Sequence, residues 1–131
     1  MIVDSSAVVA VISEEPDAAA FTEAMIRAGR LRMSAATYLE TSIVVDARRD
    51  PVAVRVVDTI LGRFGVEVEA FTAEHADIAR AAYRDFGKGT GHPARLNFGD
   101  CFAYALAKAT GEPLLYKGDD FGHTDIRSAL E

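Results

Sequence analysis

Short apolar segments alternate with longer helical stretches along the whole chain, and this alternation constrains the fold more than any other feature. The apolar segments have strand-like composition and lie at 1–4, 31–34, 66–71 and 113–116. The stretches between them predict helices over 7–12, 18–28, 37–49, 52–64, 72–86 and 97–111. Because parallel strands need a crossover that is usually a helix, this order predicts a three-layer α/β/α fold with a mostly parallel central sheet.

The length of 131 residues fits one domain, and the sequence contains no internal repeat, low-complexity tract or linker. We therefore predict a single domain over residues 1–131. The glycine-rich segment 87–93 is its clearest loop. In the helix expected over 37–49, one face carries an apolar stripe typical of a helix that packs on a core: Leu39, Ile43, Val44 and Ala47.

Composition narrows the class of protein. Half of the residues (50%) are apolar and 26% are charged, which excludes intrinsic disorder and a coiled coil. No apolar run reaches the roughly 18 residues of a membrane span, and no basic segment precedes the first apolar residues as in a secretory signal. The lone cysteine, Cys101, is interpreted as a small buried hydrophobe. We expect a cytoplasmic protein that does not contact membranes.

The net charge is −6, from 14 Lys and Arg against 20 Asp and Glu. Proteins that bind nucleic acid through phosphate contacts alone are usually basic, so this balance argues against simple electrostatic binding. An acidic protein can still bind a polyanion when divalent cations occupy its carboxylates and reverse the local field. The positions of individual acids therefore matter more than their number.

Two acids follow predicted strands. Asp4 ends the first strand and Asp119 follows the last one, so both are expected in the crevice beyond the carboxyl ends of the sheet. Asp4 can equally be a helix cap, since Asp is a favoured capping residue. The pair Asp119 and Asp120 after Gly118 can equally form a simple turn.

Asp100 is the most informative acid because it lies within the most apolar helix of the chain. A buried carboxylate is costly unless it is paired, hydrogen-bonded or bound to a metal, so its position favours a functional role over a first-turn acid that only matches the helix dipole. Glu40 lies on the helix after the second strand, where a solvated Glu is common. Together these acids predict a carboxylate cluster at one edge of the sheet.

Carboxylate oxygens suit Mg²⁺ or Mn²⁺ better than zinc. His75, His92 and His123 show no zinc-ligand spacing with Cys101. For His123, which is near the acids in sequence, an outer-shell or surface role is expected. The sequence contains no P-loop, dinucleotide fingerprint or serine-nucleophile elbow.

Four motifs in this order resemble the PIN domain, and more closely the VapC-type toxins of bacterial toxin–antitoxin pairs. They are MIVDSSA at 1–7, YLET at 38–41, NFGDCFAYA at 97–105 and LLYKGDDF at 114–121. The resemblance covers essentially the whole chain. It implies a PIN-like fold and a Mg²⁺-dependent endoribonuclease in which bound ions activate a water and stabilise the phosphoryl oxygens.

By that resemblance, Asp4, Glu40 and Asp100 take the three main acidic positions, as catalytic residues and metal ligands. Asp119 is expected as the fourth acid, with Asp120 as the fallback. The small hydroxyl residue after the first aspartate corresponds to Ser5 or Ser6, which we expect at the substrate.

Basic groups near these acids are candidates for binding RNA phosphates. The candidates are Arg80, Arg84, Lys88 and Arg95, with His92, around the glycine-rich loop, and Lys117 beside the last strand. An ordinary solvated helix face explains the first two equally well.

The resemblance also implies a cognate VapB-type antitoxin whose carboxyl-terminal segment covers the acidic crevice, toxin homodimers, larger toxin–antitoxin assemblies, and DNA contact only through the antitoxin. Apolar residues of the first helical segments are compatible with an interface, although core packing explains them equally well: Val8, Val11, Ile12, Phe21 and Met25.

Two other functions use the same features. Aspartyl-phosphate phosphotransfer also places acids and Mg²⁺ at a sheet edge, but Asp4 lacks a second acid two residues later. A non-catalytic scaffold domain would carry the acids as structural groups. Activation of RNA cleavage by metal discriminates among the three.

Overall fold

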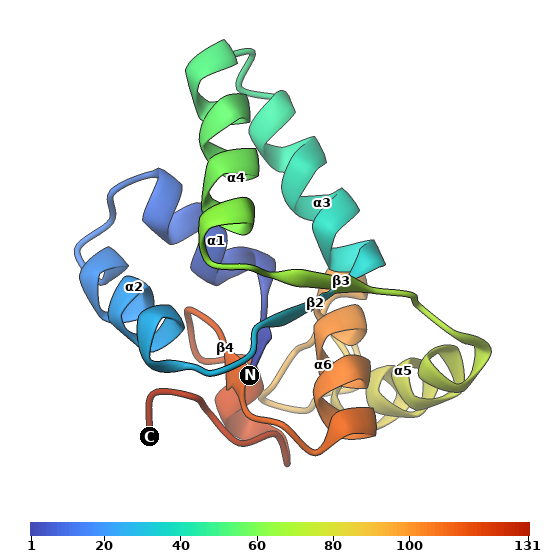
Figure 1. The fold of residues 1–131 in the computed structure, drawn as a ribbon. Coiled ribbons are helices and arrows are strands. Elements are labelled where there is room, and N and C mark those ends of the chain that lie inside the picture. The colour runs from blue at the N-terminus through green and yellow to red at the C-terminus, as the bar shows by residue number, and fades with distance from the viewer.

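The computed structural model describes residues 1–131 and contains a four-stranded sheet between layers of helices (Figure 1). The elements along the chain are β1 (Ile2–Val3), α1 (Ser5–Ile12), α2 (Ala18–Arg27), β2 (Arg32–Ser34), α3 (Ala35–Asp46), α4 (Pro51–Arg63), β3 (Glu67–Glu69), α5 (Ala73–Phe86), α6 (Phe98–Thr110), β4 (Leu114–Leu115) and the short 3-10 helix η1 (Phe121–His123). All strand pairs are parallel, in the order β3-β2-β1-β4. The predicted three-layer fold is confirmed.

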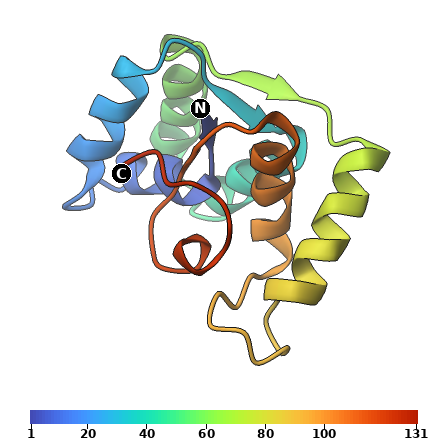
Figure 2. The ribbon, with the colours of Figure 1, turned by 90° about the horizontal axis from the view of Figure 1, so that it is seen from below.

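The sheet buries a different core on each face because successive side chains of a strand point to opposite sides. Val3, Met33 and Leu115 face one side, where they pack with residues of α1, α2 and α4. Ile2 and Leu114 face the other side and pack with α5 and α6. Figure 2 shows the two helical layers on opposite sides of the strands. Since all four strands are parallel, their carboxyl ends share one edge of the sheet.

Local sequence signals explain where the helices that border this edge begin. Asp4 caps α1 by accepting a hydrogen bond from the Ser6 N–H (3.1 Å). Asn97 and Asp100 form a reciprocal capping box at the start of α6. α6 ends at Gly111, whose φ of 70° is a left-handed conformation that glycine adopts without strain.

The expected apolar face of α3 is wrong. Leu39, Ile43 and Val44 are 59%, 59% and 43% exposed, and Ala47 is exposed as well. The buried face instead consists of Thr37, Thr41 and Val45, spaced four residues apart. These smaller side chains allow α3 to lie against α1, α4 and α6, and the Thr41 hydroxyl donates to the Thr37 carbonyl (2.8 Å) within the helix. Packing geometry therefore overrides hydropathy in this helix.

The apolar residues of the first helical segments serve the core. Val8, Phe21 and Met25 are buried in it, and Val11 and Ile12 pack against it from the side. The core interpretation of these residues is thus the one that the structure supports. None of the helices is long and apolar enough to cross a membrane.

Candidate active site

Asp4 lies at the carboxyl end of β1 and is 3% exposed. Its Oδ2 accepts hydrogen bonds from the backbone N–H and the hydroxyl of Ser6, at 3.1 and 2.6 Å. Its Oδ1 is buried and has no hydrogen-bond partner. A cap needs only one oxygen, so capping leaves the second, buried oxygen unexplained.

Glu40 extends from α3 toward the same edge and meets two other elements there. Its Oε1 accepts a hydrogen bond from the Ser5 hydroxyl at 2.9 Å. Its Oε2 lies over Gly99 in the first turn of α6, so closely that a Cβ at residue 99 would be only 1.8 Å away. Thus α1 holds the Glu40 carboxylate, and the missing side chain of Gly99 makes room for it.

Gly99 is part of this arrangement, and sequence reasoning missed it. A glycine inside a helix costs about 1 kcal/mol relative to alanine, so its presence beside Asp100 was a signal of close approach to another group. The sequence could not identify that group, because Glu40 is far away along the chain and is brought to Gly99 only by the packing of α3 against α6.

Asp100 is partly buried at the third position of α6. Its Oδ2 accepts a hydrogen bond from the Asn97 N–H (2.9 Å), while the Asn97 side-chain oxygen accepts one from the Asp100 N–H (2.9 Å). The alternative role of Asp100 as a first-turn acid is therefore real. It does not exclude a second role, because the capping bond occupies only one carboxylate oxygen.

The pKa shifts of the acids show that their charges act on one another. Burial raises the pKa of Asp100 to about 7, and the negative charges of Asp4, Asp120 and Glu40 add to this increase. Burial also raises the pKa of Asp4, against the lowering effect of its hydrogen bonds from Ser6, and the charge of Glu40 raises it further. None of these acids forms an ion pair with a basic side chain.

The fourth acid is better represented by Asp120 than by Asp119. Both are exposed in the turn before η1. Only Asp120 is among the charges that act most strongly on Asp100. On this ground Asp120, the fallback residue, is the better candidate for the fourth acid.

The carboxylate oxygens of these acids are suitable ligands for a divalent cation, and they lie near one another. Three or four carboxylates converge on one edge, and one buried oxygen, Oδ1 of Asp4, has no protein partner. The side chains are not already arranged as a coordination shell, since no group of three or more His, Cys, Asp and Glu residues could hold an ion as it stands. One oxygen of each of Asp4, Glu40 and Asp100 is held by a hydrogen bond, so completing a shell requires side-chain rotation.

Lys117 does not contact phosphate in the arrangement observed. Its ammonium group is paired with Glu15 and Asp17 on the connection between α1 and α2. Its backbone N–H instead donates to the Ser6 hydroxyl at 2.9 Å. The expected phosphate contact of Lys117 stays a prediction, and its side chain would have to leave these two carboxylates to make it. What the structure shows is that the Lys117 backbone fixes the serine that holds Asp4.

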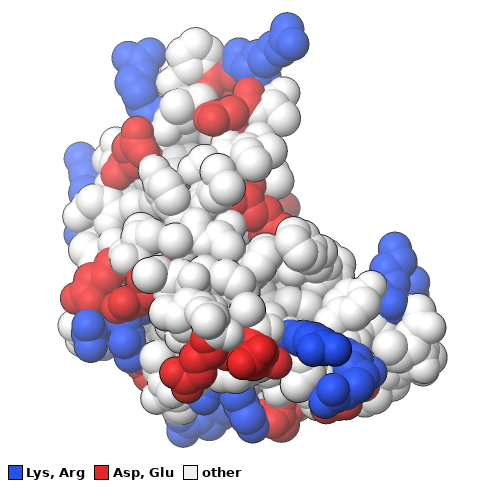
Figure 3. Space-filling view, turned by 90° about the vertical axis from the view of Figure 1, so that its right-hand side faces the viewer, with Lys and Arg blue, Asp and Glu red and all other residues white.

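The other basic candidates lie on the second half of α5 and on the loop before α6. Figure 3 shows blue side chains at the lower right, over the second half of α5 and the following loop, next to a largely uncharged centre. Arg84, Lys88 and Arg95 are exposed, and the only ion-pair contact among them is a 3.6 Å one from Arg84 to its neighbour Asp85. His92 has a structural role, because its Nδ1 accepts from the Ala94 N–H and its ring packs on Phe86.

Cysteine and the other histidines do not contribute ligands. Cys101 is buried and its thiol donates to the Asn97 carbonyl (3.4 Å). Burial raises its pKa to about 11, which keeps it protonated. His75 packs near Phe71, and His123 is exposed in η1. The interpretation of Cys101 as a small buried hydrophobe is confirmed.

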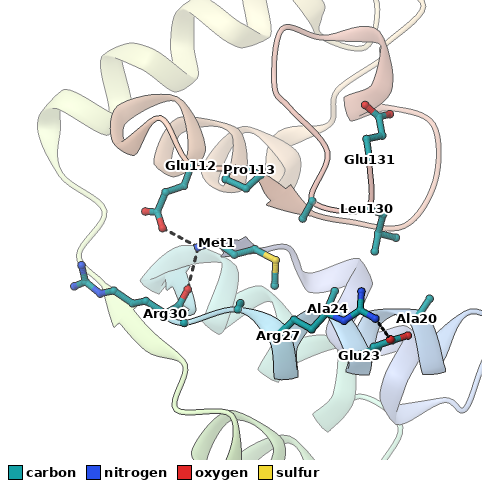
Figure 4. A pocket seen from close by; sticks show the side chains of 13 residues that line it. Met1, Ala20, Glu23, Ala24, Arg27, Arg30, Glu112, Pro113, Leu130 and Glu131 are labelled. Atoms are coloured by element: carbon teal, nitrogen blue, oxygen red, sulfur yellow. Dashed lines mark hydrogen bonds and ion pairs between the residues drawn. The ribbon is translucent and has the colours of Figure 1, made fainter.

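The largest cavity, about 640 Å³, lies at the opposite edge of the sheet, among the residues that precede the strands (Figure 4). All of its charged side chains except Glu131 are paired. Arg27 pairs with Glu23, Arg30 pairs with Glu67, and Glu112 accepts a hydrogen bond from the amino group of Met1 at 2.7 Å. Size alone would select this cavity, but nearly all of its charged groups are paired, whereas the acids of the carboxyl edge have no basic partner.

Comparison with known proteins gives the same family from sequence and from structure. The PIN domain family model matches residues 1–127. Ribonuclease VapC28 of Mycobacterium tuberculosis is 53% identical over 131 residues, which is 100% of this chain and 98% of the relative. Ribonuclease VapC30 of the same species is 54% identical over 127 residues, covering 96% of this chain and 95% of the relative.

Two solved structures share the fold. The toxin VapC20 of Mycobacterium tuberculosis, described as cleaving the sarcin-ricin loop, superposes with a TM-score of 0.72 at 19% identity and covers 95% of each chain. A toxin–antitoxin complex from Klebsiella pneumoniae gives a TM-score of 0.69 at 15% identity, over 92% of this chain and 88% of that one. Fold, edge acids and near-complete coverage by its relatives agree: the chain belongs to the PIN domain family, among the VapC ribonucleases.

Proposed function

We propose that this protein is a divalent-metal-dependent endoribonuclease, built as one domain over residues 1–131, that acts as the toxin of a toxin–antitoxin pair in the cytoplasm. The observation that carries the proposal is the cluster of Asp4, Glu40 and Asp100, with Asp120, at the carboxyl edge of the sheet. The acids face one another without a basic partner, which is costly unless a cation or a bound group compensates them. Relatives named as ribonucleases favour this function over phosphotransfer or a scaffold role.

The acids would hold Mg²⁺ or Mn²⁺. Asp4 offers its free Oδ1, and Glu40, Asp100 and Asp120 offer the oxygens that hydrogen bonds leave open. When bound, the ion would lower the pKa of a water and stabilise negative charge on the phosphoryl group. Asp119 remains the alternative fourth ligand.

The chain's own residues orient these ligands. Ser6 fixes Oδ2 of Asp4 and is itself fixed by the Lys117 N–H, so the segment after β4 and the start of α1 jointly hold the first acid. Ser5 fixes Glu40, and Asn97 fixes Asp100. The two serine hydroxyls lie at the same edge, which supports the expectation that they contact the substrate. Arg84, Lys88 and Arg95 would attract the RNA backbone, a steering effect that salt weakens.

A cognate antitoxin is the expected protein partner. The unpaired negative charge of the crevice suits a segment that inserts a basic side chain, and one structural neighbour is a toxin–antitoxin complex. We also propose a homodimer and a larger assembly with the antitoxin, which would supply any contact with DNA. Co-expression with the neighbouring reading frame, followed by purification of the complex and an RNA cleavage assay, tests this partner.

The activity itself is tested with the purified protein, total RNA, and either Mg²⁺ or a chelator, with mapping of the cut ends. A Mg²⁺ titration followed by thermal unfolding gives an independent readout of the metal. We expect cleavage only with metal and a rise in Tm for the wild type but not for Asp4→Asn. Cleavage that survives chelation, or a metal-induced shift that survives in Asp4→Asn, would contradict the assignment.

A further inference from the structure

Asp120 lies on a loop that leaves β4 and returns to it. After β4 the chain passes through η1 and comes back beside Leu114, whose N–H donates to the Arg127 carbonyl and whose carbonyl accepts from the Ala129 N–H, each at 2.9 Å. We call residues 116–126 the acid loop. Figure 2 shows it in red as a wide loop next to α6. Both ends of the acid loop are thus tied to the sheet, while its middle depends on other contacts.

Asp120 has no opposite charge to hold it in place. It is exposed and forms no ion pair. Its negative charge is among those that act most strongly on Asp100. Because the two carboxylates repel each other, their interaction favours movement of the acid loop away from α6. Contacts elsewhere in the acid loop must therefore keep Asp120 beside Asp100.

Phe121 anchors the acid loop on its inner side. Its side chain is 2% exposed, belongs to the core on the α6 side of the sheet, and packs on the Tyr116 ring with centroids 5.1 Å apart. Its carbonyl accepts from the N–H and the hydroxyl of Thr124, at 3.0 and 2.7 Å. These bonds make η1 and the residues up to Thr124 one compact turn around a buried ring.

A second anchor joins the end of this turn to α6. The Tyr104 hydroxyl donates to Oδ1 of Asp125 at 2.7 Å, and the Lys108 ammonium group pairs with Oδ2 at 2.5 Å. Although burial alone would raise it, these bonds lower the pKa of Asp125, so the carboxylate is ionised. Tyr104 is only 5% exposed, and a hydrogen bond to an ionised acceptor is roughly twice as strong as a neutral one. The buried hydroxyl is therefore an effective anchor for the acid loop.

This second anchor and Asp100 share one face of α6. Asp100, Tyr104 and Lys108 are spaced four residues apart, and residues four apart lie one above the other on a helix. The acid loop runs alongside this face, with Asp120 near Asp100 and Asp125 bonded to Tyr104. The bond that ties the loop to the helix thus lies about one helical turn from the acids.

We propose that Tyr104 and Asp125 are positioning residues, whose hydrogen bond holds the acid loop on α6 and keeps Asp120 within reach of the bound cation. Their effect passes through Asp120, and neither residue is a ligand itself. This inference rests on the proposed metal-dependent function. It adds to that function the contact that holds the fourth ligand against the repulsion of the other acids.

The metal itself is the probe, and its binding is measured by calorimetric titration of the full chain with Mn²⁺ in the absence of RNA. We expect Tyr104→Phe, which removes only the hydroxyl, to weaken binding about threefold to tenfold. This is less than the roughly tenfold to hundredfold effect of groups that hold a ligand directly. Asp125→Ala should weaken binding to a similar extent. Tyr83→Phe is the matched control, because it removes a hydroxyl that donates to the Lys88 carbonyl (3.3 Å) outside the acid loop, and it should bind Mn²⁺ as the wild type does.

The Mg²⁺ dependence of cleavage separates positioning from a contribution to stability alone. In folded Tyr104→Phe, the Mg²⁺ concentration that gives half-maximal cleavage should rise about threefold to tenfold, while the rate at saturating Mg²⁺ stays within about twofold of the wild type. Without metal, hydrogen exchange of the Thr124 N–H should become about fivefold faster, because the loop opens more often.

A double-mutant cycle tests whether the effect passes through Asp120. In an Asp120→Asn background, Tyr104→Phe should cause no further loss of Mn²⁺ affinity, because the carboxylate that it positions is gone. An equally large loss in that background would overturn the inference, since the hydroxyl would then act through α6 and Asp100.

The remaining outcomes separate this inference from the proposed function. If the wild type binds Mn²⁺ and cleaves RNA, and both Tyr104→Phe and Asp125→Ala lower Tm without changing Mn²⁺ affinity, the pair is purely structural. That result overturns the inference and leaves the ribonuclease standing. A wild type that neither binds Mn²⁺ nor cleaves RNA overturns the proposed function, and the inference with it.

Discussion

The two edges of the sheet carry similar acidic residues in opposite environments. At the amino ends of the strands, Glu112 pairs with the amino group of Met1 and with Arg32, and Glu67 pairs with Arg30. At the carboxyl ends, Asp4 and Asp100 have only other acids as charged neighbours. One edge is therefore neutralised from within the chain, while the other is left negative.

The pKa values of the acids differ accordingly. Burial alone would raise the pKa of Glu112, but its hydrogen bonds from the terminal amino group and Arg32 outweigh burial and lower it. At the other edge, burial and like charges act together, and the pKa of Asp100 rises to about 7. A paired acid stabilises the fold, whereas an unpaired, partly buried acid destabilises it. The comparison assigns structure to one edge and chemistry to the other.

The largest expected effect is on activity at the carboxyl edge. Asp4→Asn should reduce RNA cleavage on the order of a thousandfold, because several kcal/mol of transition-state stabilisation are lost with a metal ligand. The folded structure should persist, since Asn keeps the cap of α1. Single-turnover cleavage and circular dichroism measure the two properties. Wild-type cleavage rates in Asp4→Asn would remove the functional distinction between the edges.

Gly99→Ala sharpens the comparison without changing a charge. The new Cβ would displace the Glu40 carboxylate, the movable end of a flexible side chain, so we expect about a hundredfold loss in kcat/KM with little change in Tm. Gly62→Ala is the matched control, because no atom lies within 4 Å of a Cβ at that position of α4. The control should keep its activity and gain roughly 0.5–1 kcal/mol of stability. Equal activity of the two variants would show that the position of Glu40 is unimportant.

At the opposite edge the expected effect is on stability alone. Glu112→Gln leaves Arg32, whose side chain is 18% exposed, without its closest carboxylate. We expect the free energy of unfolding to fall by about 2 kcal/mol, as measured by urea denaturation, with unchanged cleavage at a temperature where the protein is folded. Glu23→Gln breaks an exposed pair and should cost less than about 0.5 kcal/mol. A loss of cleavage in folded Glu112→Gln would mean that the amino edge contributes to chemistry.

The smallest effect concerns the pH dependence of the metal-free protein. The pKa of Asp100 is raised by folding from about 4, so its contribution to stability is present below pH 4 and is lost as the pH rises through about 7. Asp100→Asn should therefore gain stability relative to the wild type between these pH values. We expect about 1 kcal/mol, since water screens the partly exposed carboxylate. A stability difference that is constant from pH 4 to pH 8 would contradict the raised pKa.

Much of the fold followed from local patterns. The possible capping role of Asp4 is confirmed, because capping depends on neighbours in the chain. The buried face of α3 was predicted wrongly, because hydropathy alone ranks Leu39 and Ile43 above Thr37 and Thr41 as core residues. The close packing of α3 on its neighbours selected the smaller side chains, and no local pattern contains that information.

The candidate site, like the fold, was predictable from the sequence only in part. Asp4, Glu40 and Asp100 were predicted from strand ends, from an acid in an apolar helix and from motif resemblance, and the structure places them at one edge. Three features of the site were not predictable. Glu40 approaches Gly99, and Asp120 acts on Asp100 more strongly than Asp119 does. The Lys117 ammonium group pairs with acids outside the site. Each depends on the direction of a side chain relative to a segment distant in sequence.

The sequence by itself determined the order of strands and helices, the parallel sheet and the acids that follow its strands, because these depend on periodicity, capping and crossover geometry within short segments. Only the tertiary structure decided which acids are neutralised and which are left facing one another. Coulombic energy depends on distances between side chains and on their burial, and both are set when distant segments pack together. The same packing left Phe98 exposed, in a pocket that Glu40 also lines.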